Sequence, residues 1–102
     1  MNLDKAREAA EELENALNAE CDRVYANAKL HSTKVANAIL ATRLYASRVR
    51  QFLFAADGPE APAVEEARRE FREVESYTGV LAGVYERNAE ISLSIASLQS
   101  LL

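Results

Sequence analysis

The chain has 102 residues, a net charge of −4 at pH 7 and 49% hydrophobic residues. This length fits a single domain, the apolar content excludes a disordered chain, and the acidic balance disfavours nucleic acid as a partner. One cysteine and one histidine exclude an internal disulfide and leave no usual set of metal ligands.

The first predicted element is a long helix over about residues 2–55. Apolar or small residues recur through it in steps of three and four, and neither glycine nor proline interrupts the segment. This spacing places them on one stripe of a helix. A continuous helix of this length would reach roughly 80 Å at 1.5 Å per residue.

A turn over about residues 56–62 follows, because this segment holds one glycine and two prolines. The second predicted helix covers about residues 63–101. It begins near Pro62, since proline is favoured in the first turn of a helix. Its apolar stripe again recurs in steps of three and four, from Ala67 to Leu102.

The two stripes predict an all-α fold, with residues 1–102 forming one antiparallel hairpin of two long helices. Charge favours this pairing, because residues 22–50 carry six bases and one acid, whereas residues 57–102 carry nine acids and four bases. A hairpin alone has no further layer to cover its apolar face. We therefore expect a homodimer that forms an elongated four-helix bundle.

Folding the hairpin about its turn places His31 beside Asn88, a layer that is polar on both sides. We expect this polar core layer to fix the register of the helices through a hydrogen bond. The alternative is that His31 binds a ligand or senses protons.

The spacing of Gly79 and Gly83 predicts a helix-packing site. Each glycine costs helix stability relative to alanine, so a compensating contact is expected. Close approach to the small residues Ala38 and Thr42 would supply it. The alternative is a small ligand cavity, which would lie beside the tyrosines of both helices, Tyr45, Tyr77 and Tyr85.

Arg43 and Arg48 flank Tyr45 on the first predicted helix. In a dimer, arginines from two subunits could receive a small carboxylate through their planar donors. The alternative is that they form ion pairs across the hairpin with acidic residues of the second helix, Glu70, Glu73 and Glu75.

Enzymatic activity is not expected. No catalytic nucleophile, phosphate-binding loop or metal-ligand spacing is recognisable, so no cofactor and no metal are expected either. Cys21 is interpreted as a small apolar core residue. The longest uncharged run is shorter than the ~20 apolar residues of a membrane span, and acidic residues occupy the place of a signal peptide's apolar core.

The stretch VANAILATRLYASRVRQFLFAADGPEAPAVEEARREF, residues 35–71, resembles the hairpin region of helical-bundle sensor domains in bacterial chemoreceptors and related transducers, of the four-helix or helical bimodular type. The shared features are a long helix with small residues and an arginine, an aromatic-leucine pair (Phe52-Leu53), an Asp-Gly turn and a helix of mixed charge. The resemblance implies a periplasmic or extracellular signalling module that dimerises and binds a small organic anion. It implies Arg43, Arg48 and Tyr45 as ligand contacts. The chain departs from this family in having no membrane helices and two predicted helices where a sensor monomer has four.

The alternative function is a helical adaptor, export chaperone or secreted helical protein that acts through a protein partner, in the cytoplasm for an adaptor or chaperone. The uncharged tail after Glu90 supports it. One face of this tail carries Ile91, Ile95, Leu98 and Leu102, and Leu93 and Leu101 widen that face. An apolar surface this broad requires more than one neighbour, which self-association or a heterologous helix would supply.

Overall fold

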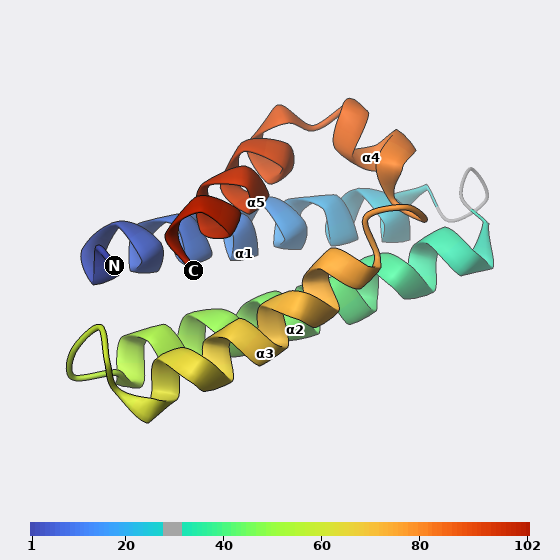
Figure 1. Cartoon of the computed structure of the whole chain (residues 1–102). Helices are drawn as coiled ribbons and strands as arrows, with labels where there is room; N and C mark the ends of the chain where they lie inside the picture. Colours follow the sequence, from blue (N-terminus) through green and yellow to red (C-terminus); the bar gives the residue numbers. More distant parts are fainter. Residues whose placement is uncertain (28–31) are drawn as a thin grey trace.

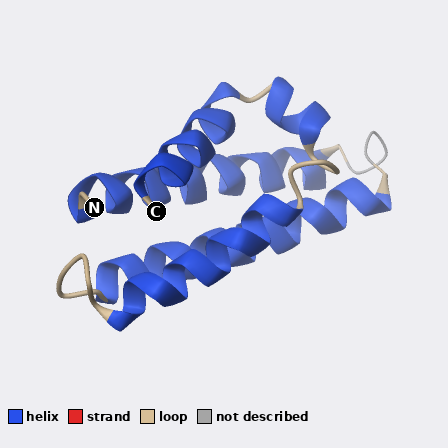
Figure 2. Ribbon diagram, in the orientation of Figure 1, coloured by secondary structure: helices blue, strands red, loops and turns tan. Residues whose placement is uncertain are grey.

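The computed structural model describes residues 1–27 and 32–102, and the regular elements in these ranges are all helices (Figure 2). They are α1 (Leu3–Ala26), α2 (Thr33–Ala55), α3 (Pro62–Ser76), α4 (Ala82–Glu86) and α5 (Ala89–Leu101). The prediction of an all-α fold is therefore confirmed.

The longer helices form one bundle. α1 packs along α2, α2 packs along α3, and α5 packs on α1. Figure 1 shows α1 and α3 running in one direction and α2 and α5 in the other, with α4 leading from the end of α3 into α5. The described structure measures 44 × 21 × 19 Å. Within the described ranges, a single chain thus supplies all four long helices of a bundle.

The helix expected over about residues 2–55 is instead two antiparallel helices. At the end of α1, Asn27 donates to the carbonyl of Arg23 through both its backbone N–H and its Nδ2 atom, at 3.1 and 3.2 Å. Before α2, the Ser32 hydroxyl accepts from the backbone N–H of Val35 at 3.2 Å. Short polar side chains favour helix ends because they bond the backbone there. The apolar spacing resumes after the break, so the pattern did not reveal it.

The helix expected over about residues 63–101 is interrupted as well. α3 ends at Ser76, and residues 77–81 form turns. Asn88 caps α5, since its Oδ1 atom accepts from the backbone N–H of Ile91 at 3.4 Å. Asn88 therefore lies at a helix end and not within a helix seam. Its expected partner in the polar layer, His31, lies outside the described residues.

The physical reason for expecting a dimer does not apply to this fold. An isolated hairpin would leave its apolar face uncovered, whereas here α5 covers part of α1 and α3 covers part of α2. Fully buried side chains come from each of these helices, including Leu13, Ile39, Val74 and Leu98. A second copy is not needed to complete this core, and the homodimer stays a prediction.

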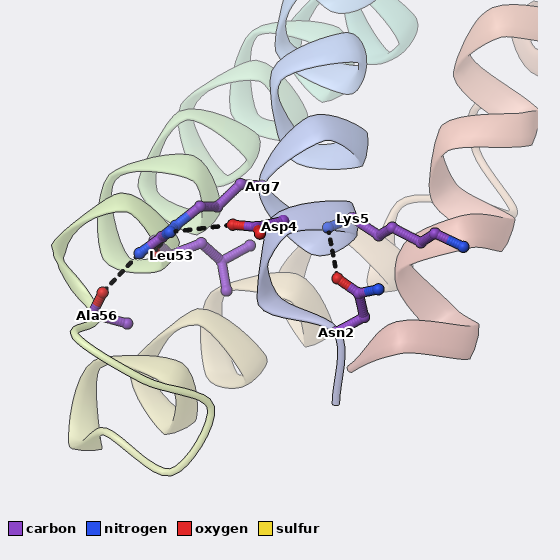
Figure 3. A network of polar contacts seen from close by, with 6 residues as sticks. All are labelled: Asn2, Asp4, Lys5, Arg7, Leu53 and Ala56. Atoms are coloured by element: carbon purple, nitrogen blue, oxygen red, sulfur yellow. Dashed lines mark hydrogen bonds and ion pairs between the residues drawn. The ribbon is translucent and has the colours of Figure 1, made fainter.

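The start of α1 is tied to the end of α2 by Arg7 (Figure 3). Its Nε atom donates to the carbonyl of Leu53 at 2.9 Å, and its Nη2 atom donates to the carbonyl of Ala56 at 2.6 Å. Asp4 lies 3.5 Å from the same guanidinium. The last carbonyls of a helix have no partner within it, so a cation placed there satisfies them and complements the helix dipole. This contact holds the end of α2 against the start of α1 and helps to determine which face of α2 points to solvent.

The turn expected at about residues 56–62 lies where α2 ends and α3 begins. Pro62 is the first residue of α3, where its missing N–H costs no hydrogen bond. None of the helices in residues 1–27 and 32–102 combines the length and the hydropathy that crossing a bilayer requires.

Candidate interaction surface

The face of α2 that points away from the bundle exposes two large apolar side chains. Six residues spaced three or four apart line it, and none is charged. We call them the α2 ridge: Asn37, Leu40, Leu44, Ser47, Gln51 and Phe54. Leu44 is 51% exposed and Phe54 is 48% exposed. Both large side chains lie outside the core that the same helix builds with its opposite face.

Positive charge borders this ridge. α2 carries four basic residues and no acidic residue, Lys34, Arg43, Arg48 and Arg50. Arg43 lines a shallow hollow of about 270 Å³ between α1 and α2, together with Glu14, Asn18, Leu44 and Ser47. Arg48 points to the other neighbour, α3, where it lies 3.8 Å from Glu70. The uncharged ridge therefore has an arginine on each flank.

Phe54 lies between two guanidinium groups at the C-terminal end of α2. The Arg50 guanidinium is 5.0 Å from the centre of the Phe54 ring, and that of Arg7 is 5.7 Å away. Arg50 also lies 3.9 Å from Glu14, which is too long for a hydrogen bond. Its Nε atom is buried and has no hydrogen-bond partner in the described part of the chain. This end of the ridge thus combines an aromatic ring with two positive charges, and the unpaired Nε donor lies below the surface.

Two of the three predicted ligand contacts come together within the chain. The Arg48 guanidinium lies 5.8 Å from the centre of the Tyr45 ring, and Tyr45 stacks on Tyr77 with 6.5 Å between ring centres. Arg43 faces α1 instead, so it does not converge with Arg48 on one point. The alternative of ion pairs between these arginines and α3 holds for Arg48 with Glu70.

The expected helix-packing site of Gly79 and Gly83 is not formed, and this prediction is wrong. Both glycines are exposed. A Cβ atom at Gly79 would meet nothing within 4 Å, and one at Gly83 would meet only the Arg87 side chain at 3.9 Å. The reason is the interruption after α3, which leaves Gly79 in a turn. The other two residues of the expected site, Ala38 and Thr42, are buried in the core.

Among the described residues, three buried side-chain atoms have no hydrogen-bond partner: Glu20 Oε2, Arg50 Nε and the Tyr85 hydroxyl. Tyr85 is 7% exposed, and its oxygen has no partner of normal geometry among the described residues. Burial raises the pKa of Tyr85 to about 12, and the nearby Thr42 hydroxyl lowers this pKa to a smaller extent. Thr42 itself donates to the carbonyl of Ala38 at 2.7 Å. Tyr85 is thus held neutral.

Cys21 is buried, as expected of a core residue. Burial raises the pKa of its thiol, while the positive charge of Arg43 acts in the opposite direction. A raised pKa makes the thiolate, the reactive form, less populated. In the part of the chain that the structure describes, histidine, cysteine and acidic side chains form no group of three or more that could hold a metal ion.

The uncharged tail is used differently from the sequence-based expectation. Ile91, Ile95 and Leu98 are buried in the bundle, and Leu93 is the large apolar residue of α5 that stays exposed, at 67%. The α2 ridge, by contrast, was missed. Its signal is present in the sequence as a second stripe in steps of three and four. It was not predicted, because the first stripe, on the opposite face of the helix, already accounted for the helical pattern.

Comparison with known proteins gives no relative. No family model, no curated protein and no solved structure matches the chain. The resemblance of residues 35–71 to chemoreceptor sensor domains therefore stays a prediction.

Proposed function

We propose that the protein is a non-enzymatic helical adaptor that binds another protein along the α2 ridge. The observation that carries this proposal is the half exposure of Leu44 and Phe54 on a helix whose other face forms the core. Apolar side chains that share one exposed helix face and are bordered by polar groups mark interaction sites. A bundle that is complete in one chain has no internal use for this face.

The arrangement also suits recognition of a helix. Residues spaced three or four apart form a continuous row, and rows of this kind pack into the groove of a second helix. The ridge from Leu40 to Phe54 extends over about 21 Å at 1.5 Å per residue. Anchors distributed over this length fit a partner helix of about four turns.

The sensor function implied by the resemblance has less support. A clamp on a small carboxylate needs two donors that converge, whereas Arg43 faces α1 and Arg48 lies beside Glu70 of α3. A second copy of the chain would have to bring such donors together. The adaptor proposal needs no rearrangement of the described residues.

Site-specific photo-crosslinking in the source cells tests the adaptor proposal. A photoreactive phenylalanine at position 44 should give a discrete adduct with one heterologous protein, and the purified partner should then bind the unmodified chain. Introducing Phe54→Ser should reduce the adduct. The matched control places the crosslinker at Leu93, the exposed leucine of α5.

Equal adducts from positions 44 and 93 would contradict the proposal, since they would reflect exposure alone. An adduct of twice the 11.3 kDa chain mass, with no other product, would replace it by self-association.

A further inference from the structure

We infer that the occupant of the α2 ridge is an acidic amphipathic helix of another protein. This inference rests on the proposed function and adds the chemistry of the partner. It is carried by the charges beside the ridge, by the donor capacity they retain and by the shape of the surface.

The charge of α2 selects against a second copy. Two copies paired through their α2 ridges would bring Arg43 and Arg48 of each chain close to those of the other. α2 carries no acidic residue, and the acids beside these arginines, Glu14 and Glu70, lie on α1 and α3. Like charges placed opposite each other across an interface weaken association. A helix with glutamate or aspartate beside its apolar stripe meets the same arginines as opposite charges.

The arginines retain donors that such a helix could use. Arg43 is exposed, and no ion pair involves it in the described ranges. Arg48, whose side chain is 48% exposed, lies 3.8 Å from Glu70, which is longer than a hydrogen bond. The unpaired Nε atom of Arg50 is buried and lies out of reach of a partner. Each guanidinium has five N–H donors in a planar fork that matches a carboxylate. Incoming carboxylates would therefore add bonds and not merely replace existing ones.

The hollow beside Leu44 gives the partner a place to insert a side chain. It measures about 270 Å³ and is lined by Arg43, Leu44 and Ser47 of α2 and by Glu14 and Asn18 of α1. An apolar residue that enters beside Leu44 and an acidic residue one turn away that reaches Arg43 form the spacing of an amphipathic helix. Ser47 and Gln51 continue the ridge without adding charge. Three arginines of α2 border it against two acids, Glu14 of α1 and Glu70 of α3, so the balance on the flanks is positive.

Three synthetic helical peptides test the inference. They share one leucine stripe and differ only in their flanking positions, which carry glutamate, glutamine or lysine, and a hydrocarbon staple keeps their helicity equal. Fluorescence anisotropy of labelled peptide gives the affinity. We expect the glutamate peptide to bind about tenfold or more tightly than the lysine peptide, with glutamine between them, and the difference to shrink at high salt.

Two variants locate the effect. Arg43→Glu combined with Arg48→Glu should reverse the order, so that the lysine peptide binds best. Leu44→Ser should weaken all three peptides without changing their order. The matched controls are Arg87→Glu on the exposed end of α4 and Leu93→Ser on α5, which should bind as the unmodified protein does. Circular dichroism confirms that each variant is folded, and Arg43→Gln alone replaces the double variant if that one does not fold.

The outcomes separate the inference from the function on which it rests. If the glutamine peptide binds best and still depends on Leu44, the acidic partner is wrong and the adaptor proposal stands. If the glutamate peptide binds equally well to the double arginine variant, the inference is overturned. If no peptide binds, it is also overturned, and the crosslinking at position 44 decides the function independently.

Discussion

α2 and α5 are both apolar on most of their surface, yet the bundle uses them in opposite ways. α5 turns Ile91, Ile95 and Leu98 into the core and presents mainly serine and alanine to solvent, with Leu93 as a single exposed large apolar residue. α2 buries Ile39, Val49 and Leu53 in the core and leaves Leu44 and Phe54 half-exposed beside arginines. The difference shows that apolar content alone does not locate an interaction surface. The surface is located instead by the large apolar residues that stay exposed together once the core is complete.

The largest expected change in stability distinguishes a buried leucine of α5 from an exposed leucine of α2. Leu98 of α5 is fully buried, so Leu98→Ala should lower the free energy of unfolding by about 2–5 kcal/mol through lost burial and the cavity left behind. Leu44→Ser on α2 should change it by no more than about 0.5 kcal/mol. Urea denaturation of both variants measures the contrast. Similar losses would mean that Leu44 belongs to the core and not to an exposed ridge.

The contact between α4 and α2 should make the free energy of unfolding sensitive to high pH. Tyr85 of α4 lies near Thr42 of α2, and its folded-state pKa is raised from 10.0 to about 12. The folded state thus holds this proton more tightly than the unfolded state. The stability that follows from this is complete below pH 10 and is lost as pH rises through about 12. Urea midpoints measured across this window should fall less for Tyr85→Phe than for the unmodified protein.

The matched control for that titration is Tyr25→Phe. Tyr25 is 64% exposed, so this variant should lose stability as the unmodified protein does. If both variants lose stability equally, Tyr85 does not set the dependence.

The attachment of α2 to α1 should depend on Arg7. Removing its side chain in Arg7→Ala leaves the carbonyls of Leu53 and Ala56 without their donor. Hydrogen bonds from a charged donor contribute about 1.5–3 kcal/mol, and partial exposure of Arg7 reduces this to about 1–2 kcal/mol. Hydrogen exchange should show faster exchange in the last turn of α2. The exposed Arg87→Ala serves as control, and equal effects of both would remove the capping role.

The smallest expected effect concerns the connection into α5. Gly83 lies in α4, its φ is not positive, and a Cβ atom there meets no atom closer than 3.9 Å. Gly83→Ala should therefore raise the free energy of unfolding by about 0.5–1 kcal/mol, since alanine loses less backbone entropy on folding. Thermal denaturation measures this gain. A lower free energy of unfolding would indicate that this glycine packs closely against another helix, which would contradict this account.

The sequence predicted the kind of element but not how often the chain reverses. Spacings of three and four established helices, and Gly58 with the two prolines located one turn. α1 ends at Ala26 and α3 ends at Ser76. The capping side chains that follow these ends, Asn27, Ser32 and Asn88, are weak signals inside an unbroken apolar pattern. Without these breaks, the sequence pattern predicts a hairpin of two helices in place of a bundle of four long helices.

The candidate site was harder to predict for a related reason. A residue is recognised as exposed and unpartnered only after the core is known, and Leu44 and Ile39 are equally apolar in the sequence. Arg43 and Arg48 flank Tyr45 along the chain, and Arg48 lies beside its ring. Their different directions, toward α1 and toward α3, depend on the helix that the hairpin interpretation lacked.

The most direct test of the α2 ridge is an NMR titration of the isotopically labelled chain with the glutamate-flanked peptide. The account predicts that amide shifts move along the ridge, most at Leu44, Ser47 and Gln51, while α5 is unaffected. Shifts concentrated instead around Leu93 and Ser97, with the ridge unchanged, would contradict it.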